Sequence, residues 1–214
     1  MDELRGRDPS VGVTRAEGIL LVALVGGALL WSALAPVDRL TWALEVMWVV
    51  VALPLLLALR QRFPLTRLLL WLLAAHALIL IYGGQYTYAL TPLGDWARTT
   101  FELQRNHYDR LGHFAQGFVP AILARELLLR LTPLRPGGWL FYLVCAAALS
   151  FSAFFEMIEW WAALVMGGDA DAYLATQGDI WDTQWDMFLA LCGALLAQLA
   201  LSRVHDRQLG LRRG

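Results

Sequence analysis

The sequence predicts an all-α polytopic membrane bundle of six transmembrane helices, with the N- and C-termini in the cytoplasm. The 214 residues are 58% hydrophobic and 16% charged, whereas soluble domains carry about 25% charged residues. The apolar residues also gather in runs of about 20, the length of helix that crosses a bilayer. A net charge of −1 argues against a nucleic-acid partner, which needs a basic surface. The lipid bilayer is therefore the expected partner.

Six apolar runs are separated by turns or polar segments. The first carries no charge, and a cleaved signal peptide is the alternative for it because residues 33–35 resemble a cleavage site. A signal-peptide core has only about 7–15 apolar residues, which favours a retained helix. The second run contains Pro54, and in a membrane a proline kinks a helix more often than it ends one. We expect transmembrane helices over 18–35, 41–59, 66–82, 109–130, 139–166 and 180–204.

The remaining segments are polar. Residues 1–17 are an N-terminal tail, 18–204 form the transmembrane domain, and 205–214 are a basic tail. The segment 83–107 is too charged to span, and 98–105 within it is a candidate helix on the membrane surface. Cys145 and Cys192 lie inside apolar runs, which favours buried free thiols over a disulfide or a metal role.

The arginines orient the bundle. All 17 basic residues are arginines, and a cytoplasmic N-terminus leaves only Arg39, Arg98, Arg105 and Arg110 on the outer side. This is the bias expected of cytoplasmic loops. The same topology puts twelve of the eighteen acidic residues outside. Because the outer arginines are too few to pair with them, we expect protons or metal ions to compensate.

Carboxylates and one histidine gather on the last three expected helices. Within each helix they are spaced three, four or seven residues apart, so they share a face. At 1.5 Å per residue their depths also agree, in the outer half of the bilayer. Ionisable residues inside membrane helices are costly and by default mark a function. The candidate metal ligands are Asp109, His113, Glu156, Glu159, Asp179, Asp182 and Asp186.

Oxygen ligands with one imidazole suit a divalent cation such as Mg²⁺, Mn²⁺ or Zn²⁺. Helix bundles hold such metals with carboxylates from several helices. His113 and Glu159 are the candidate catalytic acid–base residues. Two alternatives stay open: a hydrogen-bonded cluster that only joins three helices, with some carboxylates protonated by burial, and a proton or ion site of a transporter.

Other ionisable residues in the apolar runs receive plainer interpretations. His76 is expected to be a satisfied buried histidine, and Glu45, near an interface, to be solvated. Glu126 lies about 20 Å below His113 along one helix. It is therefore expected to pair with an arginine on the cytoplasmic side rather than to join the outer residues.

Six stretches spread over nearly the whole chain carry a resemblance to a known family. They read DRLTWALEVM, RFPLTRLL, HALILIYGGQYTYA, YDRLGHFAQGFVPAILARE, FFEMIEWWAALVMG and TQGDIWDTQWDMFLALCGALLA. Together they resemble the YjdF-like family of bacterial inner-membrane proteins. The resemblance implies a multi-pass protein of the bacterial cell inner membrane, and it supplies no substrate or catalytic residue.

A weaker likeness involves part of the same motifs. The matching residues are Asp109, Arg110, His113, Phe114, Glu156, Glu159, Asp179, Asp182, Gly193 and Ala194. This pattern is similar to that of VanZ-like membrane proteins, which are associated with glycopeptide-antibiotic tolerance. VanZ-like chains usually carry an asparagine after the aspartates, where this chain has Asp186 nearby.

The sequence thus favours an integral inner-membrane protein with an acidic, metal-ready site facing the periplasmic leaflet. As an enzyme it would use the metal to polarise a phosphoryl or carbonyl oxygen, in hydrolysis or transfer on a lipid or lipid-linked envelope precursor. The alternative is a non-catalytic transporter or membrane assembly factor that uses the same residues as an ion site or as structural contacts.

Overall fold

The computed structural model describes residues 12–167, 174 and 176–211. Within these ranges every regular element is a helix. The elements are α1 (Arg15–Leu34), α2 (Arg39–Leu59), α3 (Arg67–Gln85), α4 (Pro92–Thr100), α5 (Tyr108–Leu131), α6 (Gly138–Met166) and α8 (Asp182–Gln208). The all-α class is confirmed, and the two cysteines are free as expected.

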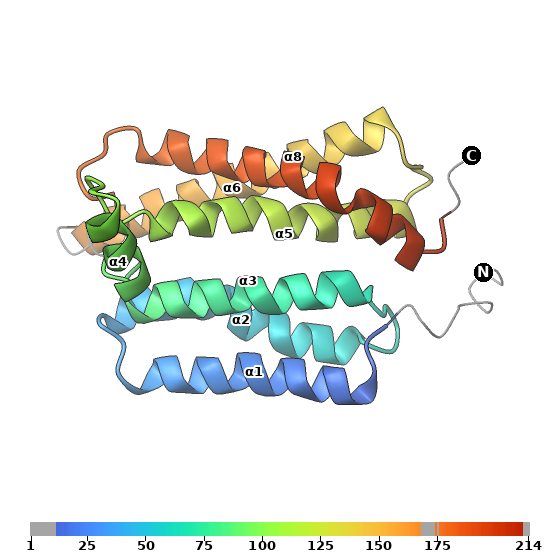
Figure 1. Cartoon of the computed structure of the whole chain (residues 1–214), viewed down its shortest axis with the longest axis horizontal. Helices are drawn as coiled ribbons and strands as arrows, with labels where there is room; N and C mark the ends of the chain where they lie inside the picture. The colour runs from blue at the N-terminus through green and yellow to red at the C-terminus, as the bar shows by residue number, and fades with distance from the viewer. Residues whose placement is uncertain (1–11, 168–173, 175, 212–214) are drawn as a thin grey trace.

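The long helices form two groups that lie side by side (Figure 1). The helices α1, α2 and α3 make one group, and α5, α6 and α8 make the other. The main contact between the groups is made by α3, which packs against α5. The short helix α4 lies across one end of the bundle, where it connects the two groups (Figure 1).

Five of the described helices, α1, α2, α3, α6 and α8, are long and apolar enough to cross a membrane. The central helix α5 is more polar than these, but twelve of its residues are buried. Its neighbours therefore shield its polar groups from the surroundings. A membrane helix bundle agrees with these elements, and α5 would be an internal member of it.

Local sequence explains several helix boundaries. Asp38 begins α2 by accepting a hydrogen bond from the Thr41 amide at 2.7 Å, a standard N-cap contact. Pro54 lies inside α2, as expected. The prediction of a surface helix over 98–105 is wrong in position. The helix at this end is α4, with Pro92 in its first turn, where the missing proline amide is no loss.

Small residues bring α5 and α8 into backbone contact. A Cβ atom built on Gly117 would overlap the carbonyl oxygen of Ala190, and one built on Gly193 would overlap that of Phe114. Only glycine allows such an approach. This contact lies next to the turns that carry His113 and Asp186, and it holds those turns together.

Side-chain contacts fix which helix ends lie together. Glu17 of α1 pairs with Arg67 at the start of α3. The next amide, that of Leu68, donates to Gln208 at the end of α8 over 2.9 Å. The start of α1 and the end of α8 therefore lie at one end of the bundle, and α4 lies at the other (Figure 1).

Candidate functional site

The acidic centre, as we name it, consists of Asp109, His113, Glu156 and Asp186. The His113 Nε2 atom lies 3.6 Å from Asp109 Oδ1 and 4.0 Å from Asp186 Oδ2. Its Nδ1 atom lies 3.7 Å from Glu156 Oε1. All four side chains are buried, with His113 only 4% exposed. The structure thus brings together residues from α5, α6 and α8 at the end of the bundle that carries α4.

Three local features position the acidic centre. Asp109 and His113 are one helical turn apart, so both project from the same face of α5. Asp186 lies in the second turn of α8, beside the glycine contact with α5. On α6, the residue before Glu156 is Phe155, whose ring meets the edge of the His113 ring at 6.0 Å between centroids.

Each residue of the acidic centre has a buried polar atom without a hydrogen-bond partner. The atoms are Asp109 Oδ2, His113 Nδ1, Glu156 Oε1 and Asp186 Oδ1. Such orphans are rare because a buried polar group without a partner costs roughly 1–3 kcal/mol. Among the described residues, no arginine forms an ion pair with these carboxylates. The centre therefore has lone pairs available for a cation or a proton.

Asp179 and Asp182 are separated from the acidic centre by their own partners. Arg105 donates to Asp182 over 2.6 Å and to Asp179 over 3.4 Å. Arg110 donates to Asp179 over 2.5 Å, and its guanidinium lies 5.2 Å from the Trp185 ring. Two of the expected metal ligands are thus already neutralised by arginines.

Glu159 lies one turn beyond Glu156 on α6 and is half-buried. It is close enough to Glu156, His113 and Asp109 to interact with them electrostatically. Glu159 therefore lies at the margin of the acidic centre. From there its carboxyl group could exchange protons both with a ligand bound in the centre and with the surroundings.

The sequence-based prediction was wrong about the environment of Glu45, and it did not include Gln116 among the buried polar residues near His113. Glu45 was expected to be solvated, but it is 5% exposed and interacts with Tyr88 and with Asp109. Gln116 is three residues after His113 on the same face of α5, and its buried Nε2 atom has no partner. The i, i+3 spacing from His113 was the available signal for Gln116. A lone glutamate near the start of an apolar run gave no such signal.

His107 precedes α5 and contributes no positive charge to this end of the bundle at neutral pH. Burial, together with the neighbouring Arg110 and Arg105, lowers its pKa below the ordinary value of about 6.5. The positive charge beside His107 therefore comes from Arg105 and Arg110, which already contact Asp179 and Asp182.

A second charged cluster, which we name the inner network, joins the C-terminal ends of α5 and α8, at the end of the bundle away from the acidic centre. Its members are Thr66, Arg125, Glu126, Arg130, His205 and Asp206. Glu126 is fully buried and accepts from the Thr66 hydroxyl at 2.7 Å and from Arg130 at 2.6 Å. The expected pairing of Glu126 with an arginine is confirmed.

The histidine of the inner network has a defined proton position. Arg125 donates to His205 Nδ1 over 2.9 Å and to Asp206 over 2.5 Å. Because Nδ1 accepts, Nε2 carries the proton and donates to Glu126 over 3.0 Å. His205 was not expected in a site because the last helix was predicted to end at 204, whereas α8 continues to Gln208.

Comparison with known proteins agrees with this architecture. Residues 18–207 match the model of the family described as "Predicted membrane protein (DUF2238)". The chain is also 52% identical, over 181 residues, to "Inner membrane protein YjdF" of Escherichia coli (strain K12), which covers 85% of this chain and 87% of the relative. No solved structure matches. The chain therefore belongs to this DUF2238 family of membrane proteins, and it is a multi-pass protein of the inner membrane.

Proposed function

We propose that the chain crosses the membrane six times, with both termini in the cytoplasm. An even number of spans agrees with the start of α1 and the end of α8 lying at one end of the bundle (Figure 1). The buried polar face of α5 suits an internal helix that other spans shield from lipid. In this topology the acidic centre lies in the periplasmic half and the inner network in the cytoplasmic half.

We further propose that the acidic centre binds a divalent cation, Mg²⁺, Mn²⁺ or Zn²⁺. The observation that supports this is the spacing of one ligand atom each from Asp109, His113 and Asp186, which lie within 4.8 Å of one another. Asp109 and Asp186 also carry buried carboxylate oxygens without partners, which adds to the argument, because a cation between these two side chains would compensate their charge. Glu156 lies on the Nδ1 side of His113, where it would accept the proton of that nitrogen and orient the ring while Nε2 binds the cation.

The remaining candidates take different roles in this proposal. A histidine that binds the metal cannot also exchange protons, so Glu159 becomes the preferred acid–base residue. Asp179 and Asp182 contact arginines and are better suited to shaping the entrance than to binding the cation. Exposed tryptophans near this end, Trp160 and Trp181 among them, suit a membrane interface.

With a cation bound, the acidic centre would support metal-assisted hydrolysis or transfer on a lipid or lipid-linked envelope precursor. The metal would polarise a phosphoryl or carbonyl oxygen. Burial within the helices favours a substrate that arrives from the bilayer. The transporter alternative is less well supported, because a pathway should continue through the inner half, where the inner network is occupied by its own ion pairs.

Metal binding to the detergent-solubilised protein tests the proposal. Mn²⁺ or Zn²⁺ should raise the melting temperature of the wild type, because a ligand at 100 times its Kd adds about 2.7 kcal/mol of stability. His113→Ala and Asp186→Asn should lose this increment and the bound metal. Asp95→Asn is the matched control, because the exposed side chain of Asp95 lies at the same end and pairs with Arg98 rather than with the acidic centre, and this variant should keep the full increment.

The opposite result is equally informative. If metals leave the wild-type melting curve unchanged, no metal co-purifies, and His113→Ala strongly lowers the melting temperature, the acidic centre is a structural contact. The metal site and the enzyme function would then both be dropped.

A further inference from the structure

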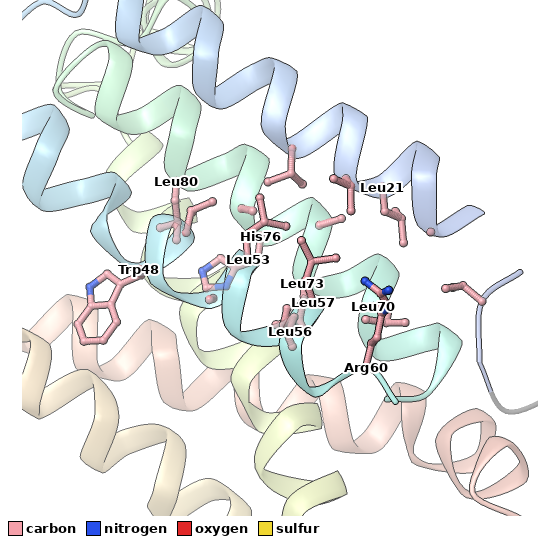
Figure 2. A pocket seen from close by; sticks show the side chains of 18 residues that line it. Leu21, Trp48, Leu53, Leu56, Leu57, Arg60, Leu70, Leu73, His76 and Leu80 are labelled. Atoms are coloured by element: carbon pink, nitrogen blue, oxygen red, sulfur yellow. The ribbon is translucent and has the colours of Figure 1, made fainter. Parts of the chain in front are cut away.

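An apolar groove lies between α1, α2 and α3, apart from the acidic centre (Figure 2). It has a volume of about 250 Å³ and adjoins a wider cavity of about 1160 Å³, with which it shares Gly18, Ala52 and Arg60 in the lining. Pockets for compact ligands usually measure about 300–1,000 Å³. Together the groove and the cavity therefore suit a larger, elongated ligand.

The groove has a polar end and an apolar body. Figure 2 shows Arg60 and Trp48 at opposite ends of the lining side chains, with leucines and His76 between them. The buried Nε2 atom of His76 has no hydrogen-bond partner, so the expectation of a satisfied histidine is wrong. Arg60 and Trp48 are twelve positions apart on or next to α2, which corresponds to about 18 Å along a helix. This is slightly more than half of the hydrocarbon core, which is about 30 Å thick. The groove thus has the depth of one leaflet.

Two arginines line the polar end of the groove and the adjoining cavity. Arg60 lines both parts of the groove and Arg15 lines the wider cavity. Within the described residues neither forms an ion pair, whereas the neighbouring Arg67 and Arg130 pair with Glu17 and Glu126. An arginine carries its charge at every physiological pH and matches the geometry of a phosphate.

We infer that this groove binds an anionic phospholipid, with its phosphate at Arg15 and Arg60 and an acyl chain along the leucines towards Trp48. Basic pockets between transmembrane helices on the cytoplasmic side are suited to anionic headgroups. The leaflet follows from the proposed topology, because these arginines lie at the end where α1 begins. The binding itself rests on neither the topology nor the metal site.

Lipid titration of the delipidated, detergent-solubilised protein tests this inference. Phosphatidylglycerol should bind, seen as retained lipid in native mass spectrometry and as a raised melting temperature, and phosphatidylcholine with the same acyl chains should bind much less. Arg15→Gln and Arg60→Gln should each weaken phosphatidylglycerol binding about fivefold, since each arginine near an anionic headgroup contributes about 1 kcal/mol. Arg39→Gln, an exposed arginine at the other end of α2, should bind as the wild type does.

Two further variants test the groove itself. Ala52→Phe, at a residue that lines both parts of the groove, should narrow it and weaken phosphatidylglycerol binding, while an unchanged lipid-free melting temperature shows that the variant folds correctly. His76→Leu, deep in the groove (Figure 2), should keep or improve binding, because only an acyl chain is expected there. Equal binding of both lipids, wild-type binding by Ala52→Phe, or weaker binding by His76→Leu would each overturn the inference.

Discussion

The acidic centre and the inner network use similar residues in opposite ways. Both join α5 to α8, and each contains one histidine and buried carboxylates. In the inner network, both carboxylate oxygens of Glu126 and both ring nitrogens of His205 have hydrogen-bond partners. In the acidic centre, His113 and Asp186 keep buried atoms without partners. The difference separates residues that hold helices together from residues that remain available to a ligand.

Glu126→Ala should have the largest effect on this comparison. It would remove the acceptor that Arg130, His205 and the Thr66 hydroxyl share, and His205 and Thr66 are fully buried. Removing one partner of a buried ion pair costs about 3–5 kcal/mol. Thermal unfolding in detergent measures the loss, and Asp95→Asn, whose pair with Arg98 is exposed, should change stability by less than about 1 kcal/mol. A small effect of Glu126→Ala would remove the contrast between the two clusters.

Gly117→Ala should have the next largest effect, because the added methyl group would overlap the backbone of Ala190. Overpacking of this kind costs about 1–3 kcal/mol. The helix shift should also weaken the metal response of the acidic centre. Gly26→Ala is the control, since a Cβ atom there meets nothing within 4 Å, and it should be neutral or stabilising by up to about 1 kcal/mol. Equal unfolding curves for the two variants would contradict the close contact.

Asp186→Asn should stabilise the metal-free protein by about 1 kcal/mol, because it removes a charge from a group of buried carboxylates that lack arginine partners. This change in the free energy of unfolding has the opposite sign to that expected for Glu126→Ala. Asp186→Asn is therefore the most decisive test of the difference between the two clusters. Chemical or thermal unfolding after treatment with a chelator measures it. If Asp186→Asn instead destabilises the metal-free protein by several kcal/mol, the acidic centre is as structural as the inner network.

Asp38→Ala should have the smallest effect on stability among these variants. It also serves as a reference for pH experiments on both clusters. The hydrogen bond from the Thr41 amide lowers the pKa of this carboxyl below its ordinary value. Its contribution is therefore complete above about pH 4 and is lost as the pH falls through the lowered pKa. Asp38→Ala should cost about 0.5–1 kcal/mol at pH 7. Unfolding measured at pH 7 and at pH 3 should show this difference shrink, and a constant difference would contradict the assigned N-cap.

Sequence periodicity identified the part of the acidic centre that lies on regular helices. Asp109 and His113 share a face because of their spacing, and the depths of Glu156 and Asp186 follow from the rise of a helix. Periodicity could not predict the partners of Asp179 and Asp182, because Arg105 lies in the irregular segment before α5. The path of such a segment depends on contacts that no local spacing records.

The inner network shows a different limit of sequence reasoning. The pairing of Glu126 with an arginine was predictable because a buried carboxylate at the arginine-rich end needs a positive partner. The role of Thr66 was not, because its contact with Glu126 spans 60 residues and joins the start of α3 to α5. His205 was missed because the apolar pattern ends before α8 does.

The backbone contact between α5 and α8 also limits how this molecule can move. With Gly117 seated against Ala190 and Gly193 against Phe114, neither helix can slide along the other without a steric clash. The close contact therefore prevents α5 and α8 from sliding past each other along their axes. A large rearrangement must instead rock the group of α1, α2 and α3 against that of α5, α6 and α8, pivoting where α3 packs on α5.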